Sequence, residues 1–224
     1  MNFDIKKVID KLKAKKKIFS CEAEFQLEMA IVIKETYGEN VTVRLEYAID
    51  SGIETSETNP GKHKKMYIDI LVKIGNDWFP IELKYKTKGK NGSDYEVEYE
   101  DEEYNLKDQG ARNLNCYAYW KDIERIEDLR GEKMPYFKEG YAIFLTNDEG
   151  YKELPKDENV DYADFSLKEN KAIKRTMSWK KTSEDGIELK GDYSTKWDDF
   201  LTIINEKDKK EIKFYYLINK IEKN

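Results

Sequence analysis

The sequence predicts a mixed α/β (α+β) domain in which a helix precedes three antiparallel strands, and a second helix leads to a further strand. Three observations predict it. Three successive stretches alternate apolar and polar residues with period two, helical spacing precedes and follows them, and an unbroken apolar stretch comes next. No repeat or Pro/Gly-rich linker divides the chain. We therefore predict a single domain over residues 1–224, with a core at roughly 20–146 and a C-terminal elaboration at 147–224 that adds strands.

The three alternating stretches cover residues 41–47, 66–72 and 78–85. Because successive side chains of a strand point to opposite sides, one set faces a core and the other set forms a polar face. The polar set contains Arg44, Glu46, Asp69, Glu82 and Lys84. The apolar set contains Val41, Val43, Leu45, Tyr47, Ile68, Ile70, Val72, Ile74, Phe79, Ile81, Leu83 and Tyr85.

The turn between the second and third strands decides whether the acidic side chains meet. A two-residue loop at 75–76 pairs Asp69 with Glu82, and one at 76–77 pairs Asp69 with Lys84. Both loops place the three side chains on one face, whereas a three-residue loop separates them. Two carboxylates and an ammonium suit Mg²⁺, with the lysine placed to orient or deprotonate a metal-bound water. An ordinary ion pair on a solvent-facing sheet is the alternative.

Helical spacing predicts a helix from Cys21 to Tyr37, capped by Ser20 and with Glu22 in its first turn. Glu22 and Gln26 fall near the middle of the apolar arc. Polar groups on the buried face of a helix need a partner there, such as an ion or a hydrogen bond. The alternative is that Glu22 simply frays in the first turn. The apolar arc contains Ala23, Phe25, Leu27, Met29, Ala30, Val32 and Ile33, and the opposite side carries Glu24, Glu28 and Glu35.

These residues resemble, in order and type, the PD-(D/E)xK superfamily of metal-dependent nucleases. Its core is a helix with an inward glutamate, three antiparallel strands carrying an aspartate and an acid-x-lysine triplet, and then a helix and a strand. The matching residues here are Glu22, Asp69 and the triplet Glu82-Leu83-Lys84. Ile68 stands where the name of the superfamily has proline.

The resemblance implies a restriction-endonuclease-like core and a role for each matching residue. Asp69 and Glu82 would hold Mg²⁺, for which Mn²⁺ can substitute, together with the Leu83 carbonyl. Lys84 would position the attacking water. Glu22 would bind a second metal or its water shell, with Glu46 as an outer candidate.

A second helix is predicted from Tyr104 to Glu127 by apolar residues at three- and four-residue spacing. Gln109 is an auxiliary candidate for the active site, because in some families of the superfamily a glutamine on this helix lies beside the catalytic residues. A surface amide is the alternative. The stretch 140–146 then predicts a buried strand after a crossover.

Charged segments follow the third strand. Lys86, Lys88 and Lys90 are candidates for contacts with a nucleic-acid backbone. The dense acidic segment 94–103 would repel nucleic acid if it covered the cleft, and we interpret it as a solvated loop or extended arm, with a lid or a partner-binding arm as alternatives.

The C-terminal third predicts fewer elements. Segments 163–168 and 172–179 are expected to form a hairpin, and residues 214–218 a late strand. Trp179 and Trp197 could stack on bases, although aromatic residues at strand spacing are more often part of the core.

Composition narrows the class of protein. The chain is 39% hydrophobic and 38% charged, with a formal charge of −6, which argues against a general nucleic-acid coating protein. No apolar run approaches the length of a membrane span, and no signal peptide is evident, so we expect a cytoplasmic protein without a membrane partner. Cys21 and Cys116 are too few for a disulfide scaffold, and His63 is the only histidine. Catalysis would therefore rest on carboxylates and lysines.

The sequence thus predicts an Mg²⁺-dependent phosphodiesterase acting on nucleic acid, with DNA favoured. A nuclease acting on RNA and a catalytically inactive relative that serves as a protein-interaction module are the alternatives. A homodimer or a protein partner stays open.

Overall fold

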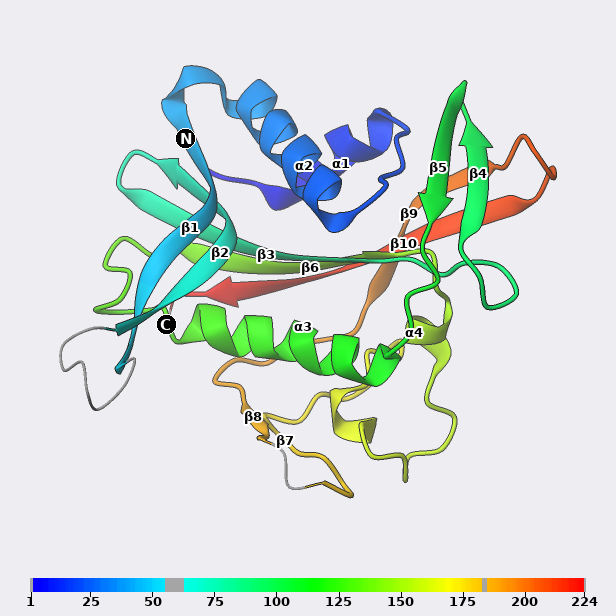
Figure 1. Ribbon diagram of the computed structural model, residues 1–224. Coiled ribbons are helices and arrows are strands. Elements are labelled where there is room, and N and C mark those ends of the chain that lie inside the picture. Colours follow the sequence, from blue (N-terminus) through cyan, green and yellow to red (C-terminus); the bar gives the residue numbers. More distant parts are fainter. Residues whose placement is uncertain (1, 55–62, 183–184, 224) are drawn as a thin grey trace.

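The computed structural model describes residues 2–54, 63–182 and 185–223 (Figure 1). In these residues six strands form a mixed sheet in the order β1-β2-β3-β6-β10-β9. Only the β3–β6 pair is parallel within this sheet. The strands are β1 (Val41–Glu54), β2 (His63–Ile74), β3 (Asp77–Lys86), β6 (Glu139–Thr146), β9 (Trp197–Ile204) and β10 (Glu211–Glu222).

Helices cover both faces of this sheet. Helices α1 (Ile5–Ala14) and α2 (Glu22–Tyr37) lie on one face, and α3 (Arg112–Glu127) lies on the other (Figure 1). The short helix α4 (Gly150–Glu153) follows β6. No helix in the described ranges has the length and apolarity needed to cross a membrane. Short 3₁₀ turns occupy Gly38–Asn40 and Ala163–Phe165, and two small hairpins pair β4 (Tyr95–Tyr99) with β5 (Glu102–Leu106) and β7 (Thr176–Met177) with β8 (Ile187–Glu188).

The strand predictions for the first half of the chain are confirmed. The β2–β3 loop is the two-residue turn Gly75-Asn76, because Ile74 pairs with Asp77. Gly75 has φ 59°, a conformation that glycine adopts without steric cost and that a tight hairpin requires at its first loop position. This is the register of the predicted loop at 75–76, and its ladder ends at the Ile70–Ile81 pair, one step before Asp69 and Glu82.

Alternating apolar residues build two cores, one on each face of the sheet. Ile70, Val72, Ile81 and Leu83 pack toward α1 and α2, as predicted. Tyr47 and Ile68 instead join the core under α3. On β1 the alternation breaks at Glu46, whose φ of 47° turns the backbone. On β2 it breaks at Asp69, because the β1–β2 ladder has no pair between Leu45–Ile70 and Tyr47–Ile68. Leu45 is exposed, and so is Leu27 on α2.

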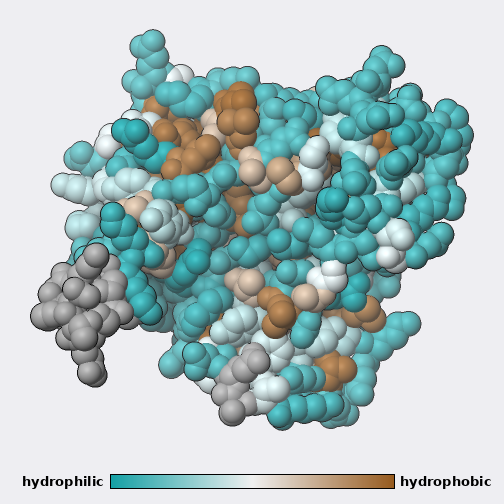
Figure 2. Space-filling view, in the orientation of Figure 1, coloured by the Kyte–Doolittle hydropathy of each residue, from teal (hydrophilic) through white to brown (hydrophobic). Residues whose placement is uncertain are grey.

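Hydrophobic residues also remain on the surface above these cores. Figure 2 shows a mostly hydrophilic face with a hydrophobic patch over α2 and β1. Leu27, Ile31 and Leu45, which belong to these two elements, are among the exposed large hydrophobic residues.

Helix boundaries differ from prediction at three places. Cys21, not Ser20, is the N-cap of α2, and the Ser20 N–H donates to Glu24 Oε2 at 2.6 Å. Helix α1, which Asp4 caps, was not predicted. Its four buried apolar residues are interspersed with lysines, and we interpreted this stretch only as a lysine-rich start of the chain. The predicted helix 104–127 begins only at Arg112, because Tyr104 and Leu106 bury their side chains as part of β5.

The C-terminal region also departs in part from prediction. Residues 163–168 do not pair with 172–179; instead Thr176–Met177 pairs with Ile187–Glu188. The late strand is confirmed as part of β10, which extends the same sheet. Trp179 and Trp197 are buried against Phe165 and Phe144, so they serve the core rather than a base-stacking surface.

Candidate active site

The β2 and β3 strands separate at Asp69. Their ladder ends at the pair Ile70–Ile81, and beyond it the Asp69 Oδ2 atom accepts a hydrogen bond of 2.7 Å from the Leu83 N–H. A side-chain oxygen thus replaces a backbone acceptor. The carboxylate of Asp69 is thereby held against the Glu82-Leu83-Lys84 triplet.

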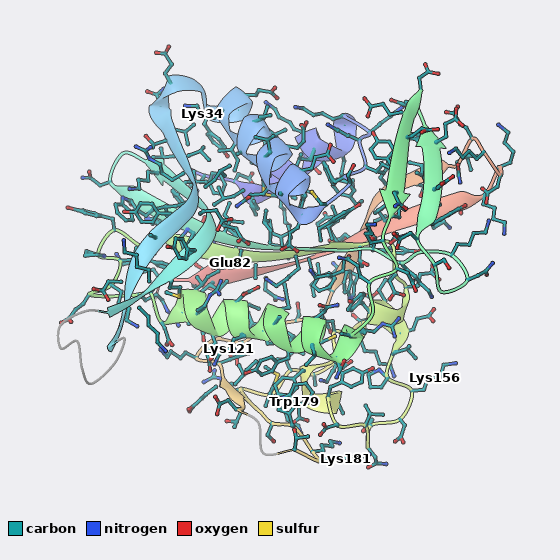
Figure 3. The ribbon with its side chains drawn as sticks, viewed as in Figure 1. Lys34, Glu82, Lys121, Lys156, Trp179 and Lys181 are labelled. Atoms are coloured by element: carbon teal, nitrogen blue, oxygen red, sulfur yellow. The ribbon has the colours of Figure 1, made fainter. Side chains whose placement is uncertain are left out.

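The triplet meets two side chains of α3 that the sequence did not single out. Glu82 lies between the sheet and α3 (Figure 3) and forms an ion pair with Arg125. Asp122 Oδ1 lies 3.3 Å from Arg125 Nη2, and Asp122 Oδ2 lies 2.5 Å from Lys84 Nζ. A continuous chain of alternating charge therefore runs from Glu82 through Arg125 and Asp122 to Lys84.

One signal for Asp122 is present in the sequence. It follows Tyr119 by three residues and precedes Ile126 by four, which places it on the buried side of α3. Asp122 is 5% exposed. A buried carboxylate requires a charged partner, and here Lys84 and Arg125 supply it.

Helix α2 directs Glu22 and Gln26 toward the sheet, as the helical wheel predicts, although the Glu22 side chain is 40% exposed and Ala23 and Leu27 of the predicted apolar arc are exposed. Glu22 Oε2 accepts hydrogen bonds from the Tyr85 N–H at 2.7 Å and from Lys86 Nζ at 3.3 Å. Gln26 Nε2 donates to the Asp69 carbonyl at 2.7 Å and to Glu46 Oε1 at 2.9 Å. Both residues therefore satisfy backbone groups where the strands separate.

The other glutamates of α2 point elsewhere. Glu24 and Glu28 form ion pairs with Lys17 at 3.1 and 3.0 Å, on the side of the helix that faces the α1–α2 loop. Of the three nearby glutamates, only Glu22 reaches the triplet strand.

Burial dominates the electrostatics of the cluster. It raises the pKa of the Asp69 carboxyl, and it raises the pKa of Glu82 well above its ordinary value, with repulsion from the Asp122 and Asp69 carboxylates adding to the effect. Burial alone would lower the pKa of Lys84, but the Asp122 carboxylate raises it above its usual value. Lys84 is thus held as an ammonium.

The charge balance of the cluster can be met either by a bound cation or by protons on Asp69 and Glu82, whose pKa values are raised. The cluster contains five carboxylates and three cationic groups, so two negative charges are uncompensated when all of them are ionised. The carboxylates belong to Glu22, Glu46, Asp69, Glu82 and Asp122, and the cations to Lys84, Lys86 and Arg125.

The donor chemistry fits a hard divalent cation. Carboxylate and carbonyl oxygens are the ligands that Mg²⁺ and Mn²⁺ prefer. Over residues 2–54, 63–182 and 185–223, no three His, Cys, Asp or Glu side chains stand in a ready-made metal-binding arrangement. Arg125 contacts the Oε1 atom of Glu82, so it competes with a cation for this carboxylate.

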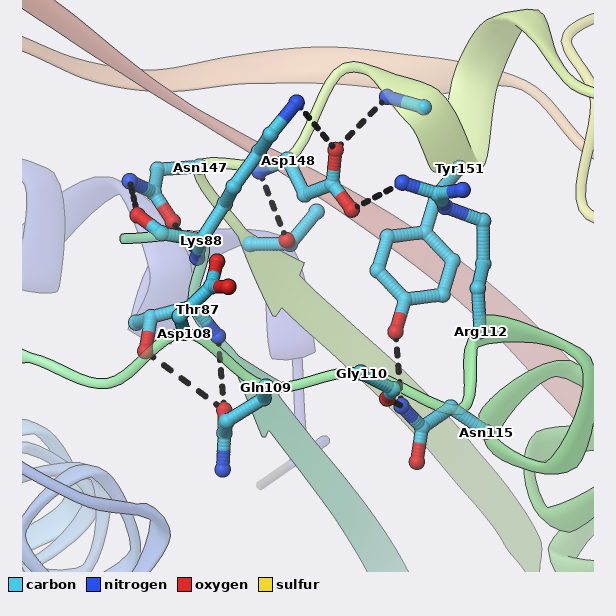
Figure 4. A network of polar contacts seen from close by, with 12 residues as sticks. Thr87, Lys88, Asp108, Gln109, Gly110, Arg112, Asn115, Asn147, Asp148 and Tyr151 are labelled. Carbon is cyan, nitrogen blue, oxygen red and sulfur yellow. Dashed lines mark hydrogen bonds and ion pairs between the residues drawn. The ribbon is translucent and has the colours of Figure 1, made fainter. Parts of the chain in front are cut away.

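Gln109 does not lie on a helix, contrary to prediction. It belongs to the loop before α3, and its Oε1 atom accepts a 2.7 Å hydrogen bond from the Thr87 N–H (Figure 4). The Gln109 N–H in turn donates to the Thr87 carbonyl. The helix begins later because residues 102–106 pair as a strand, so Gln109 clamps the end of β3 rather than projecting from a helix face.

The three candidate lysines after the triplet have different surroundings. Lys86 pairs with Glu22, as described, and Lys90 Nζ lies 2.5 Å from Asp208 Oδ2. Lys88 Nζ is 3.7 Å from Asp148 Oδ1, and its side chain is 58% exposed.

The acidic segment 94–103 forms most of the β4–β5 hairpin, an extended arm. Val97 buries its side chain in the core below α2, and Lys207 forms ion pairs of 3.3 Å with both Glu96 and Glu103. Asn205 Oδ1 also accepts from the Glu98 N–H at 3.0 Å. These contacts tie the arm to the β9–β10 turn.

No protein-family model, curated protein or solved structure matches this chain. Its function therefore has to be inferred from its own residues.

Proposed function

We propose that this protein is a divalent-metal-dependent phosphodiesterase with a restriction-endonuclease-like core of the PD-(D/E)xK type, and that it hydrolyses nucleic acid, with DNA as the favoured substrate. The observation that carries the proposal is the convergence of Glu22, Asp69, Glu82 and Lys84 from one helix and two strands at the point where those strands separate. The order α2-β1-β2-β3-α3-β6, interrupted only by the β4–β5 hairpin between β3 and α3, and the parallel pairing of β6 with β3 support it.

Each residue has a role that its surroundings support. Asp69, Glu82 and the Leu83 carbonyl would hold Mg²⁺ or Mn²⁺, which supplies an acidified water and neutralises charge on the phosphate. Lys84 Nζ lies 3.3 Å from the Leu83 carbonyl, so its ammonium faces the same place. Because Asp122 raises the pKa of Lys84, this lysine donates a hydrogen bond to water or phosphate rather than accepting a proton. Glu22 would bind a second cation or its water shell.

A non-catalytic relative that serves as a protein-interaction module is a second candidate, and one observation favours it. Arg125 forms an ion pair with Glu82, and the Leu83 N–H donates a hydrogen bond to Asp69. Both carboxylates therefore have partners in the absence of a cation. For either candidate we place the protein in the cytoplasm, which its free thiols at Cys21 and Cys116 support.

A cleavage assay tests the proposal. Supercoiled, linear and single-stranded DNA and RNA are each incubated with Mg²⁺, Mn²⁺ or EDTA. We expect metal-dependent products from DNA and none in EDTA. If only RNA yields products, the substrate is RNA rather than DNA. Absence of products from every substrate, together with absence of Mn²⁺ binding by calorimetry, would overturn the nuclease proposal and leave the interaction module as the remaining candidate.

A further inference from the structure

A cleft of about 400 Å³ lies beyond the end of β3, and four lysines line it. Its walls come from the β3–β4 loop, the loop after β6 and the start of β10, three segments far apart in the sequence. The lining side chains that matter here are Lys88, Lys90, Lys210, Lys213, Tyr95 and Tyr215.

Two carboxylates also line the cleft, and each already has a partner. Glu149 accepts a hydrogen bond from the Tyr215 hydroxyl, and Glu211 Oε1 lies 3.1 Å from Lys213 Nζ. Two of the lysines pair with carboxylates just outside the lining, Lys88 with Asp148 and Lys90 with Asp208, and Asp148 also pairs with Arg112. With these partners counted, five cationic groups face four carboxylates, so one net positive charge is left on a chain whose formal charge is −6. Such a local reversal of sign predicts an anionic ligand.

Lys90 and Lys210 approach each other from opposite walls of the cleft. The Asp208 carboxylate, paired with Lys90, raises the pKa of the Lys90 ammonium, and Lys210 acts in the same direction. Lys90 therefore remains positively charged beside Lys210.

The wall that carries Lys88 is fixed in place (Figure 4). The Lys88 N–H donates to Asn147 Oδ1 at 2.7 Å, and Asn147 Nδ2 donates back to the Lys88 carbonyl at 3.0 Å. At Gly89 a Cβ atom would lie 1.9 Å from the Ser93 carbonyl oxygen, so glycine is required there. A loop held in this way loses little entropy when a ligand binds.

The cleft continues the line of the candidate active site. Lys84, Lys86, Lys88 and Lys90 recur at every second residue, and the distance from Lys84 to Lys88 along an extended chain is roughly 13 Å. Tyr95 adds a partly exposed ring, with Lys90 Nζ 4.9 Å from its centroid. Lysines beside an aromatic ring are the usual composition of a single-strand binding groove.

We infer that this cleft binds the sugar–phosphate backbone of a single-stranded nucleic-acid segment that leads away from the Glu22, Asp69, Glu82 and Lys84 site. The choice of nucleic acid as ligand rests on the proposed function. The new residues are Lys210 and Lys213, which come from the opposite wall and complete the groove.

Fluorescence anisotropy of labelled single-stranded DNA in EDTA tests this inference without cleavage. The double variant Lys210→Ala/Lys213→Ala should bind about tenfold more weakly. The slope of log K against log salt should fall by about 1.4, as the loss of two phosphate contacts on a single strand predicts. The matched control is Lys156→Ala/Lys181→Ala, which removes two lysines beyond the α3 side of the sheet (Figure 3) and should bind like the unaltered protein.

The possible outcomes separate the cleft from the catalytic proposal. Unchanged affinity and slope in the Lys210→Ala/Lys213→Ala variant, beside metal-dependent cleavage by the unaltered protein, would overturn the cleft alone. An equal loss of affinity for duplex DNA would overturn the single-strand assignment. Binding that depends on Lys210 and Lys213, in a protein that cleaves nothing with Mg²⁺ or Mn²⁺, would overturn the proposed function and keep the cleft.

Discussion

Arg125 of α3 forms an ion pair with Glu82 of β3, whose side chain is 1% exposed. The pair joins the helix under the sheet to the residue that is expected to hold the metal. Since a guanidinium and a cation compete for the charge of one carboxylate, we expect Arg125 to weaken cation binding at Glu82.

The first prediction concerns this pair. Arg125→Gln should lower stability in EDTA by about 2 kcal/mol, less than the roughly 3–5 kcal/mol for a fully buried pair because the Arg125 side chain is 37% exposed. It should also strengthen Mn²⁺ binding, since Glu82 is then free. Calorimetry measures both. Lys121→Gln, on the same helix, is the control and should change neither. Weaker Mn²⁺ binding in Arg125→Gln would show that the arginine supports the site rather than competing for Glu82.

The second prediction concerns the metal ligands. Asp69→Asn and Glu82→Gln should each abolish cleavage and weaken Mn²⁺ binding in a folded protein, because each removes an anionic oxygen ligand. Asp77→Asn, in the same β-hairpin, should retain both properties. Undiminished Mn²⁺ binding by the Asp69→Asn/Glu82→Gln double variant would place the cation elsewhere.

The third prediction concerns pH. Burial raises the pKa of Asp69 and Glu82, so the folded state binds protons more tightly than the unfolded state at these groups. Their contribution to stability is therefore largest below the ordinary carboxyl range and is lost as pH rises toward the raised pKa values. In EDTA, the Asp69→Asn/Glu82→Gln double variant should lose less stability than the unaltered protein over this window.

Adding Mg²⁺ should reduce the same pH-dependent loss in the unaltered protein, because a cation bound by the folded state favours the ionised carboxylates. Urea unfolding at several pH values, with and without Mg²⁺, measures the difference. Parallel curves for the two proteins would mean that Asp69 and Glu82 titrate normally.

The fourth prediction concerns Lys84. Lys84→Met should lower kcat about 100-fold or more while leaving DNA affinity and Mn²⁺ affinity near those of the unaltered protein, because its role lies in the transition state. Lys86→Met is the matched variant, since Lys86 pairs with Glu22 and lies two residues further along β3. If Lys86→Met is inactive and Lys84→Met is active, the catalytic lysine is Lys86 and our assignment of Lys84 is wrong.

The fifth prediction compares the glutamates of α2. Glu22→Gln should cost far more activity than Glu24→Gln or Glu28→Gln, because only Glu22 contacts the triplet strand. Gln26→Ala should have an intermediate effect, since Gln26 supports the Asp69 carbonyl. Single-turnover cleavage rates and melting temperatures of all four variants provide the test. Equal activity of Glu22→Gln and Glu24→Gln would refute the role of Glu22.

The sequence by itself determined the local features of this protein. Period-two alternation specified β1, β2 and β3. Of the loops that the sequence left open, both two-residue turns keep Asp69, Glu82 and Lys84 together, and the structure has the one at Gly75-Asn76. Helical periodicity specified which side of α2 carries Glu22. These features depend on neighbours within a few residues, so the pattern of the chain is sufficient to define them.

Only the tertiary structure decided the partners of these residues. The pairing of Glu82 with Arg125 spans 43 positions, and the placement of Lys210 beside Lys90 requires β10 to join the same sheet. The position of Gln109 also depends on tertiary structure. Residues 102–106 pair with β4 as strand β5, so the helix that was predicted to carry Gln109 begins after it. Such contacts are set by the packing of segments distant in sequence, and single-chain periodicity carries no information about which distant side chains meet.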